Sequence, residues 1–523
     1  MNAFSSCAEN PAAENGRDDD AAAFVAGLTV YYADAVRPAL DNIDLTVDGG
    51  VTLIAGPTGC GKSTLLHAIA GLLDSESTAA VSGDIRLSGE SIAAAGRGRR
   101  RSERVGLIQQ DPAAQATAAT VEDEVRFPLL CAGWEADRME RRVSETLSAA
   151  GLLALRRRDP QTLSGGQAQR LAIACALAPG PRVLLADEPT SQLDPRGAAE
   201  TLAALRRAAD EQGVAVLLSE HRVEAAARVA DRIVLLDRGR IMLSANAKDH
   251  TRWAPTAKRL GLAVGGSAMG SNGSAEKRNA PVAPALRLSA KRLSFRYPHA
   301  AADAVSEITI SLAGAERVAL LGANGSGKST LLRLLAGVLR PRAGRVAPHP
   351  KDHRVGLTLQ SPDVMLFCPT VANELSFGPR RARKGRDAVA GLAQQLLQRF
   401  CLTEFAGRPP LTLSRGQRQR VAVAATLACN PDVLLLDEPT TGQDAGPLDD
   451  WFRVVFELTP TVVFATHDLA FAGRWASRWV VLKEGRVVFD GPADQAKCDE
   501  DMLAIAGLLA SGPERPHERP ATT

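Results

Sequence analysis

The amino-acid sequence predicts an α/β fold in which one domain occurs twice. Three observations support this prediction. Several segments recur in the same order and at the same spacing in the two halves of the chain. Short apolar runs, typical of strands buried on both faces, precede glycine-rich segments, and helical patterns follow them. We therefore expect two domains, each with a mostly parallel core sheet.

The internal repeat is the strongest of these observations. Written as first copy and second copy, the repeated segments are GPTGCGKST (56–64) and GANGSGKST (322–330), VGLIQQDP and VGLTLQSP, LSGGQAQR and LSRGQRQR, and VLLADEPT (183–190) and VLLLDEPT (433–440). The separation from Gln110 to Ser164 is 54 residues, and the separation from Gln360 to Ser414 is the same. Chance does not produce such agreement, so we interpret the chain as two copies of one domain.

The repeat also sets the expected domain boundaries. We place the first domain at residues 21–262 and the second at 285–508. Residues 263–284 between them are rich in Gly, Ser, Ala and Pro without apolar periodicity, as in a flexible linker. The acidic N-terminal segment 1–20 has neither the positive start nor the apolar core of a secretory signal, and we expect it to be a disordered tail. Residues 509–523 form a C-terminal tail in this division.

Composition narrows the functional classes. A chain of 523 residues with 45% hydrophobic and 23% charged residues is long enough for more than one globular domain. It contains no run of about 18 apolar residues, so we expect no membrane span. A net charge of +3 does not indicate a nucleic-acid partner, and we expect none. Eight cysteines without a CxxC pair argue against a zinc site or a disulfide framework and favour the cytoplasm.

The glycine-rich segments are the first to carry chemistry. Each follows an apolar run (51–55 and 318–321) and precedes a helical pattern (65–73 and 331–339). In GxxxxGK[ST], backbone N–H groups converge on a phosphate, the lysine reaches the terminal phosphates and the hydroxyl binds Mg²⁺. One match alone also fits an ordinary glycine-rich turn, but two matches in this setting favour phosphate binding. The residues concerned are Gly56, Gly59, Gly61, Lys62, Ser63 and Thr64, and Gly322, Gly325, Gly327, Lys328, Ser329 and Thr330.

An acidic pair follows a buried strand pattern in each half. Asp187 and Asp437 end these patterns, where an unpaired carboxylate is costly, so a nearby cation is expected. The adjacent Glu188 and Glu438 then polarise an attacking water, as phosphoryl transfer requires. A solvated strand end is the alternative for an isolated Asp-Glu pair. Their place within LLxDEPT, at this distance from a phosphate loop, favours the catalytic interpretation.

The segments LSGGQ and LSRGQ point to a family. Ser164 with Gln167, and Ser414 with Gln417, have the spacing of a helix capping box, which by itself indicates only a capped helix. LSGGQ followed 24 residues later by the glutamate of DEPT, however, resembles the ABC ATPase family, and the resemblance covers nearly the whole chain. It implies RecA-like P-loop domains, each with a mostly parallel core sheet, an antiparallel β edge and a helical signature subdomain, that hydrolyse ATP with Mg²⁺.

The same resemblance implies two composite sites, each closed by the signature segment of the other domain. For the first site it implies Tyr32, the glycine loop with Lys62 and Ser63, Gln110, Asp187, Glu188 and His221, closed by Ser414 and Gly416. For the second it implies Tyr297, the loop with Lys328 and Ser329, Gln360, Asp437, Glu438 and His467, closed by Ser164, Gly165 and Gly166. The implied magnesium ligands are Ser63, Gln110 and Asp187, and Ser329, Gln360 and Asp437. Each tyrosine would stack on adenine, although a lone tyrosine there also fits core packing. Each histidine would contact the γ-phosphate, although a lone histidine is more often a hydrogen-bonded polar residue.

One residue departs from the family pattern. Arg415 stands where LSGGQ has its first glycine. Glycine there permits unusual dihedral angles and a close backbone approach, both of which arginine makes harder. We therefore expect the site that contains Lys62 to be altered.

The segments after the two glutamines resemble a subgroup of this family. QDPAAQATAATVEDEVRFPL and QSPDVMLFCPTVANELSFGP are similar to the Q-P-x-x-Q…T-V-x-x-E-[VL]-x-F-G-P pattern of energy-coupling factor ATPases, the motors of vitamin and metal-ion importers. SEHR around His221 resembles fused members linked to thiamine-precursor uptake. Met365 in place of the second glutamine and Pro128 without a preceding glycine depart from the pattern.

That resemblance implies partners and a location. Such motors lie on the cytoplasmic face of the membrane and hold a transmembrane coupling protein, which carries a substrate-binding membrane subunit. The segments 110–127 and 360–377 would form the grooves for its coupling helices. The alternative is a soluble tandem ABC protein that acts on ribosomes as a translation factor. Such proteins have a long, charged helical linker, which 263–284 does not resemble.

Overall fold

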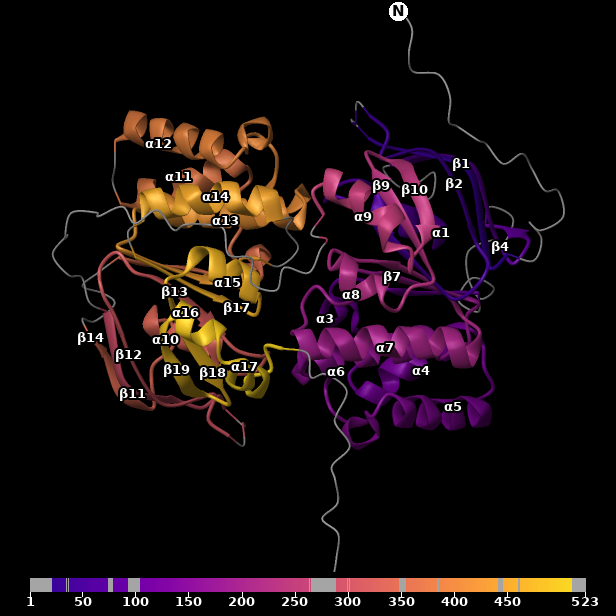
Figure 1. Ribbon diagram of the computed structural model, residues 1–523, viewed down its shortest axis with the longest axis horizontal. Coiled ribbons are helices and arrows are strands. Elements are labelled where there is room, and N and C mark those ends of the chain that lie inside the picture. The colour runs from indigo at the N-terminus through magenta and orange to yellow at the C-terminus, as the bar shows by residue number, and fades with distance from the viewer. Residues whose placement is uncertain are drawn as a thin grey trace, which may run out of the picture. The chain divides into compact units, whose positions relative to one another are not determined.

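The computed structural model describes most of the chain as two compact units, which we take one at a time (Figure 1). The described residues are 21–33, 35, 37–73, 79–92, 104–262, 264, 288–298, 300, 302–347, 354–382, 385–440, 445–459 and 461–509. The predicted tail 1–20, all but residue 264 of the linker after 262, and residues 510–523 lie outside them. None of the helices in these ranges combines the length and the hydropathy that crossing a bilayer requires.

The core sheet of the first unit has six strands in the order β10-β9-β3-β8-β7-β6. They are β3 (Val51–Ala55), β6 (Val105–Ile108), β7 (Val183–Asp187), β8 (Ala215–Ser219), β9 (Arg232–Asp237) and β10 (Arg240–Asn246). All neighbours pair in parallel except β10, which pairs antiparallel with β9 at the edge. Every residue of β3, β7 and β8 is buried, which explains their uninterrupted apolar sequences.

A second, antiparallel sheet of the first unit has the order β2-β1-β4-β5. Its strands are β1 (Ala23–Tyr32), β2 (Leu40–Val47), β4 (Ala79–Leu87) and β5 (Glu90–Ser91). Side chains of β1 and β2 share one apolar core with helix α1 (Lys62–Ile69) and with the core-sheet strands β7 and β8. The antiparallel sheet therefore covers the side of the core sheet where α1 packs.

Three of the remaining helices in the first half, α4 (Val121–Cys131), α5 (Ala136–Ala149) and α6 (Gly165–Leu177), form a separate layer. The others are α3 (Pro112–Gln115), α7 (Pro195–Gln212), α8 (Val223–Ala227) and α9 (His250–Arg259), with short 3₁₀ turns at Leu153–Leu155 and Pro160–Thr162. Residues of α4, α5 and α6 make an apolar core of their own. This layer is the helical subdomain that the family resemblance implied.

The second unit repeats this architecture. Its core sheet has the order β15-β16-β17-β13-β18-β19, again parallel except at the last strand, and its antiparallel sheet has the order β12-β11-β14. The strands are β11 (Leu288–Phe295), β12 (Val305–Leu312), β13 (Arg317–Leu321), β14 (Ala343–Ala347), β15 (Val355–Thr358), β16 (Val433–Asp437), β17 (Thr461–Thr466), β18 (Arg478–Lys483) and β19 (Arg486–Pro492). The α/β fold with two mostly parallel core sheets is thus confirmed.

The helices of the second unit also follow the first. They are α10 (Lys328–Leu335), α11 (Val371–Arg381), α12 (Arg386–Arg399), α13 (Arg415–Ala428), α14 (Ala445–Leu458), α15 (Leu469–Trp475), α16 (Ala493–Lys497) and α17 (Glu500–Ile505), with 3₁₀ turns at Pro362–Val364, Thr403–Phe405 and Pro410–Thr412. Within this unit, α11 and α12 lie at the end away from β11 and β12 (Figure 1). The helices predicted at 65–73 and 331–339 begin three residues earlier and end before Gly71 (φ 64°) and Gly337 (φ 72°), because these glycines adopt the left-handed conformation that ends a helix.

Candidate functional site

A glycine loop joins a buried strand to a helix in each unit, between β3 and α1 and between β13 and α10. Gly61 (φ 108°) and Gly327 (φ 102°) precede the two helices in the left-handed region. A Cβ on Gly61 would lie 2.6 Å from the carbonyl oxygen of Ala39, so this position requires glycine. Both loops therefore turn sharply into a helix N-terminus, the geometry that favours phosphate binding.

The loop lysines are held inside these turns. Lys62 is 4% exposed, and its Nζ donates to the carbonyl oxygens of Gly56 (2.8 Å) and Pro57 (3.2 Å). Lys328 donates in the same way to Gly322 (2.8 Å) and to the next residue (3.1 Å). In the first unit this buried ammonium donates to neutral carbonyls, whereas in the second unit Lys328 also lies 3.6 Å from a carboxylate oxygen of Glu438. A buried ammonium favours the arrival of an anion, and a terminal phosphate has the required charge.

The two tyrosines lie beside the loops. The hydroxyl of Tyr32, the last residue of β1, is 3.2 Å from Oγ1 of Thr64. The hydroxyl of Tyr297 is 3.3 Å from Oγ1 of Thr330, and 36% of the residue is exposed. An aromatic ring is thus placed next to each phosphate loop by the antiparallel sheet, in the same way in both halves.

In the first unit, three predicted residues converge on one carboxylate. Glu188, directly after β7, accepts a hydrogen bond from Nε2 of Gln110 at 2.7 Å, and its other oxygen lies 2.6 Å from Nε2 of His221. Gln110 follows β6 and His221 follows β8, the two neighbours of β7. The carboxyl ends of adjacent parallel strands meet at one edge of the sheet, which is why residues far apart in sequence meet here.

The second unit arranges the corresponding carboxylate differently. Glu438 lies 3.6 Å from Nζ of Lys328 and 3.1 Å from Nδ1 of His467. Burial opposes its ionisation, but His467 and Lys328 outweigh burial and hold the pKa of Glu438 below its ordinary value. Glu438 is therefore a buried carboxylate whose ionised form is favoured by His467 and Lys328.

The aspartates before these glutamates are also buried. Asp437 is 1% exposed and accepts a hydrogen bond from Oγ of Ser329 at 2.9 Å. Burial raises the pKa of Asp437 to about 6, more than the serine hydrogen bond and the nearby cations lower it. Asp187 is 6% exposed and ends β7 at the equivalent place.

Ser219, the last residue of β8, belongs to the site although its sequence pattern did not predict it. Its Oγ donates to Oδ1 of Asp187 at 2.6 Å and accepts from the backbone N–H of Glu188 at 3.0 Å. The second half has Ala465 at this position. A comparison of SEH (219–221) with ATH (465–467) would have identified the position, but it would not have predicted the hydrogen bond to Asp187.

The T-V-x-x-E segments shape the loops that follow Gln110 and Gln360. The hydroxyl of Thr370 caps helix α11, and the carboxylate of Glu374, 4% exposed, accepts from the backbone N–H groups of Phe367 (3.1 Å) and Cys368 (2.8 Å). In the first unit the hydroxyl of Thr120 caps α4, and Glu124 accepts from the N–H groups of residues 117 (2.9 Å) and 118 (2.7 Å). The motif thus holds the preceding loop against its helix in both halves.

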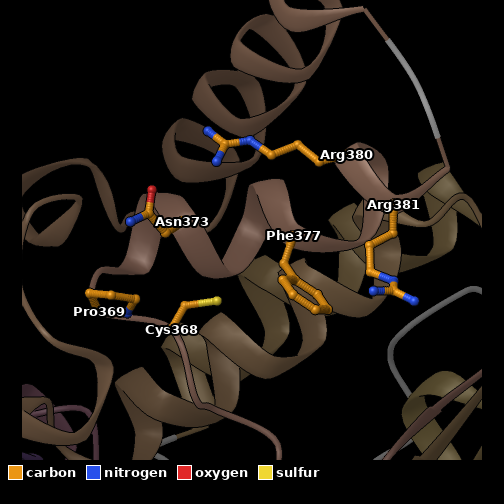
Figure 2. Close-up of a pocket in the computed structure, with 6 residues that line it drawn as sticks. All are labelled: Cys368, Pro369, Asn373, Phe377, Arg380 and Arg381. Atoms are coloured by element: carbon orange, nitrogen blue, oxygen red, sulfur yellow. The ribbon is translucent and has the colours of Figure 1, made fainter.

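Large apolar side chains lie on the surface in these loops and on the helices that follow them. Phe127 is 56% exposed in the first unit, and Phe367 and Phe377 are 66% and 41% exposed in the second. The rings of Phe367 and Phe377 meet edge to face with centroids 4.8 Å apart. Beside them is a hollow of about 430 Å³, shown in Figure 2, with the lining residues Cys368, Pro369, Asn373, Phe377, Arg380 and Arg381.

The signature segments begin helices, as expected. The hydroxyl of Ser414 accepts from the N–H of Gln417 at 3.3 Å, and the Gln417 side chain accepts from the Ser414 N–H at 2.9 Å, so the predicted capping box is confirmed there. Ser164 precedes α6, which starts with Gly165 and Gly166.

The structure changes the reasoning about Arg415. It is the first residue of α13 and is not among the described residues with positive φ. Arginine therefore meets no backbone obstacle at this position, and our expectation based on dihedral angles was wrong. Any effect of Arg415 must come from its side chain.

Comparisons with known proteins agree with this geometry. The ABC transporter family matches residues 40–191 and 305–441. The chain is 34% identical to a Methanosarcina mazei protein over 92% of this chain and 90% of the relative, and 35% identical to a Streptomyces coelicolor protein over 89% and 93%. Both relatives are provisionally named ABC transporter ATP-binding proteins.

A solved structure extends the likeness in fold over both units. It is described as the complex of an archaeal ribosomal stalk protein with an archaeal ribosome recycling factor, and it covers 93% of this chain and 93% of that chain with a TM-score of 0.57. At 21% identity the likeness concerns the fold alone. On the family match and the two relatives, the chain belongs to the ABC transporter family and is an ATPase with two ATP-binding α/β domains in tandem.

Proposed function

We propose that this chain is the ATP-hydrolysing motor of a membrane importer of the energy-coupling factor type, which takes up a vitamin, a vitamin precursor or a metal ion. In this proposal the chain lies on the cytoplasmic face of the membrane. It holds a transmembrane coupling protein, which in turn holds a substrate-binding membrane subunit. The first support for this proposal is that the segments after Gln110 and Gln360 resemble those of energy-coupling factor ATPases.

The observation that carries the proposal is the exposed apolar surface after Gln360. Phe367 and Phe377 are both exposed, although burying an aromatic side chain is strongly favourable, so this surface fits a protein partner. The buried Glu374 holds the loop that presents Phe367, next to Phe377 on α11. Gln360, which the resemblance assigns to the ATP site, begins the same segment, so a partner seated here would respond to nucleotide.

The exposed surface after Gln360, the second surface, differs in charge from the corresponding first surface after Gln110. The second carries the exposed Arg380 and Arg381, whereas the first has Leu130 and Cys131 at the same positions. The side chains of Phe377 and Arg381 extend from the same side of α11 in Figure 2. We therefore propose that the partner presents two different segments, with an apolar and acidic one for the second surface.

Each half also has the residues for one Mg-ATP. Mg²⁺ prefers oxygen ligands. The first half offers Ser63, Gln110 and Asp187, and the second offers Ser329, Gln360 and Asp437. Asp437 fits such an ion because its buried carboxyl has a raised pKa, which shows that the unpaired anion is disfavoured there. When bound, the ion neutralises charge on the phosphates.

In the proposed reaction Glu188 and Glu438 accept a proton from the attacking water, and His221 and His467 orient the γ-phosphate. The serines of the signature segments, Ser164 and Ser414, would close each site from the other domain. ATP binding would close the two domains and hydrolysis would reopen them, a two-state change biased by the γ-phosphate.

The proposal is tested by isolating the tagged full-length chain from its own cells, in detergent, from membranes. A multi-span membrane protein should remain bound to the wild type. The variant Phe367→Asp/Phe377→Asp should lose it, whereas Val338→Asp, at a residue 65% exposed elsewhere in the second unit, should keep it. Thermal unfolding of each variant controls for folding.

Two outcomes would contradict the importer proposal. One is a membrane partner that the double aspartate variant still binds. The other is sedimentation of the wild type with ribosomes, which would favour the translation-factor alternative.

A further inference from the structure

Ser219 connects the two acidic residues of the first ATP site. It lies directly beside Asp187 in the parallel pairing of β8 with β7 and is fully buried. Its hydroxyl donates to Oδ1 of Asp187 at 2.6 Å and accepts from the backbone N–H of Glu188 at 3.0 Å. A hydroxyl has one proton to give, so the bond to the carboxylate fixes its orientation and leaves a lone pair for the amide.

The residue that this hydroxyl holds is strained. Glu188 has φ 47°, in the left-handed region that a non-glycine residue seldom adopts. Its N–H also points to the carbonyl oxygen of Ser219, at 3.1 Å. One amide therefore has two acceptors on the same residue, and the hydroxyl links the backbone of Glu188 to the side chain of Asp187.

The second half lacks this link. Ala465 pairs with Asp437 in the equivalent register, and Glu438 has nearly the same φ of 48°. Its N–H donates to the carbonyl oxygen of Ala465 at 3.0 Å, and a methyl group replaces the hydroxyl. Asp437 instead accepts from Ser329 of the phosphate loop. The two halves thus support the same acidic pair in different ways.

We infer that Ser219 is a positioning residue of the first ATP site, and that the two ATP sites of this chain differ through it. Ser219 holds the Asp187 carboxylate and the Glu188 backbone in one relative orientation before nucleotide and metal arrive. Loss of the hydroxyl frees the Asp187 carboxylate, which would bind the metal, and removes one support of the strained glutamate. This difference lies inside each half and is independent of Arg415.

The first test uses the full-length chain with ATP and Mn²⁺ as the probe for the metal. Electron paramagnetic resonance counts bound Mn²⁺ and gives its affinity at each site. Ser219→Ala should weaken one of the two Mn²⁺ affinities about tenfold, the effect expected when a hydrogen bond to a charged group is lost. Ser219→Thr, which keeps the hydroxyl, should stay within about threefold of the wild type. ATP binding without metal should not change in either variant.

The second test measures turnover with one site disabled. In a Glu438→Gln background, Ser219→Ala should lower the remaining ATPase rate about tenfold. The matched control is Ala465→Ser in a Glu188→Gln background, which should stay within about twofold because the second half does not depend on this position. Thermal unfolding confirms that each variant is folded.

Three results would overturn the inference. The first is an unchanged Mn²⁺ affinity in folded Ser219→Ala. The second is a loss in Ser219→Thr as large as in Ser219→Ala, because that would assign the effect to packing. The third is an equal loss in Ala465→Ser, because both halves would then be merely sensitive to any change at this strand end.

Discussion

Replacement of Asp437 by asparagine should make the nucleotide-free chain more stable at neutral pH. The carboxyl is 1% exposed, and burial raises its pKa from an ordinary value of 3.8 to about 6. A raised carboxyl pKa means that the folded state holds the proton more tightly than the unfolded state. The contribution to stability is therefore fully present below pH 4 and is lost as the pH rises through 6.

The size of the effect follows from the shift. About two pKa units correspond to about 3 kcal/mol between pH 4 and pH 8. Asparagine does not titrate, and its Oδ1 still accepts from Ser329, so Asp437→Asn avoids this loss. For a unit of this size, 3 kcal/mol raises Tm by about 6 to 12 °C. The variant should exceed the wild type by this amount at pH 8 and match it near pH 4.

Scanning calorimetry in EDTA, without nucleotide, measures the difference across this pH range. Three of the five tryptophans, Trp451, Trp475 and Trp479, lie in the second unit, so tryptophan fluorescence reports more strongly on that unit than on the first. With Mg-ATP the order should reverse, because only the wild type offers a carboxylate to the ion. A gain in stability that does not depend on pH, or no gain at pH 8, would refute the reasoning.

Three further predictions concern the ATP sites. Glu188→Gln and Glu438→Gln should each lower turnover at their own site by about 10² to 10⁴ while ATP still binds, because only the base is removed. Wild-type turnover in the double variant would exclude both glutamates as bases. Arg415→Gly and Arg415→Ala should change ATPase activity to the same extent, because Arg415 already has helical dihedral angles. The change should be larger in a Glu438→Gln background than in a Glu188→Gln background. A difference between the Gly and Ala variants would show that the backbone conformation at residue 415 matters. Tyr32→Ala should weaken ATP binding about tenfold, as loss of a stacked ring does, and Tyr32→Phe should not, because it keeps the ring and loses the hydroxyl that lies beside Thr64. Nucleotide titration distinguishes the two variants, and an equal loss in both would assign the effect to the hydroxyl and not to stacking.

Much of each site was predictable because the repeat compares the sequence with itself. The positions of Lys62, Asp187 and Glu188 recur at the same spacing as Lys328, Asp437 and Glu438, and the structure places all of them at the carboxyl edge of a parallel sheet. The pattern did not reveal why Thr370 and Glu374 occur together. Only the folded loop shows that one caps a helix while the other binds the two N–H groups before it.

The sequence was less informative where a substitution was judged by residue type alone. Glycine at the position of Arg415 suggested a special backbone, but the residue begins an ordinary helix, whose dihedral angles do not require glycine. Conversely, Ser219 and Ala465 differ by a single hydroxyl at the end of apolar strands. Composition and periodicity do not indicate that this hydroxyl matters. Its importance depends on strand register, which brings it beside Asp187.

By itself, the sequence determined that this protein has two α/β domains with one phosphate loop and one acidic pair each, because local patterns of glycine, charge and apolar runs specify these elements. Tertiary structure alone decided how each acidic pair is held. Glu188 bonds Gln110 and lies beside His221, whereas Glu438 lies beside Lys328 and His467. The physical reason is that burial makes each charge depend on the few groups within about 4 Å of it, and those groups arrive from strands that are neighbours in the sheet but distant along the chain.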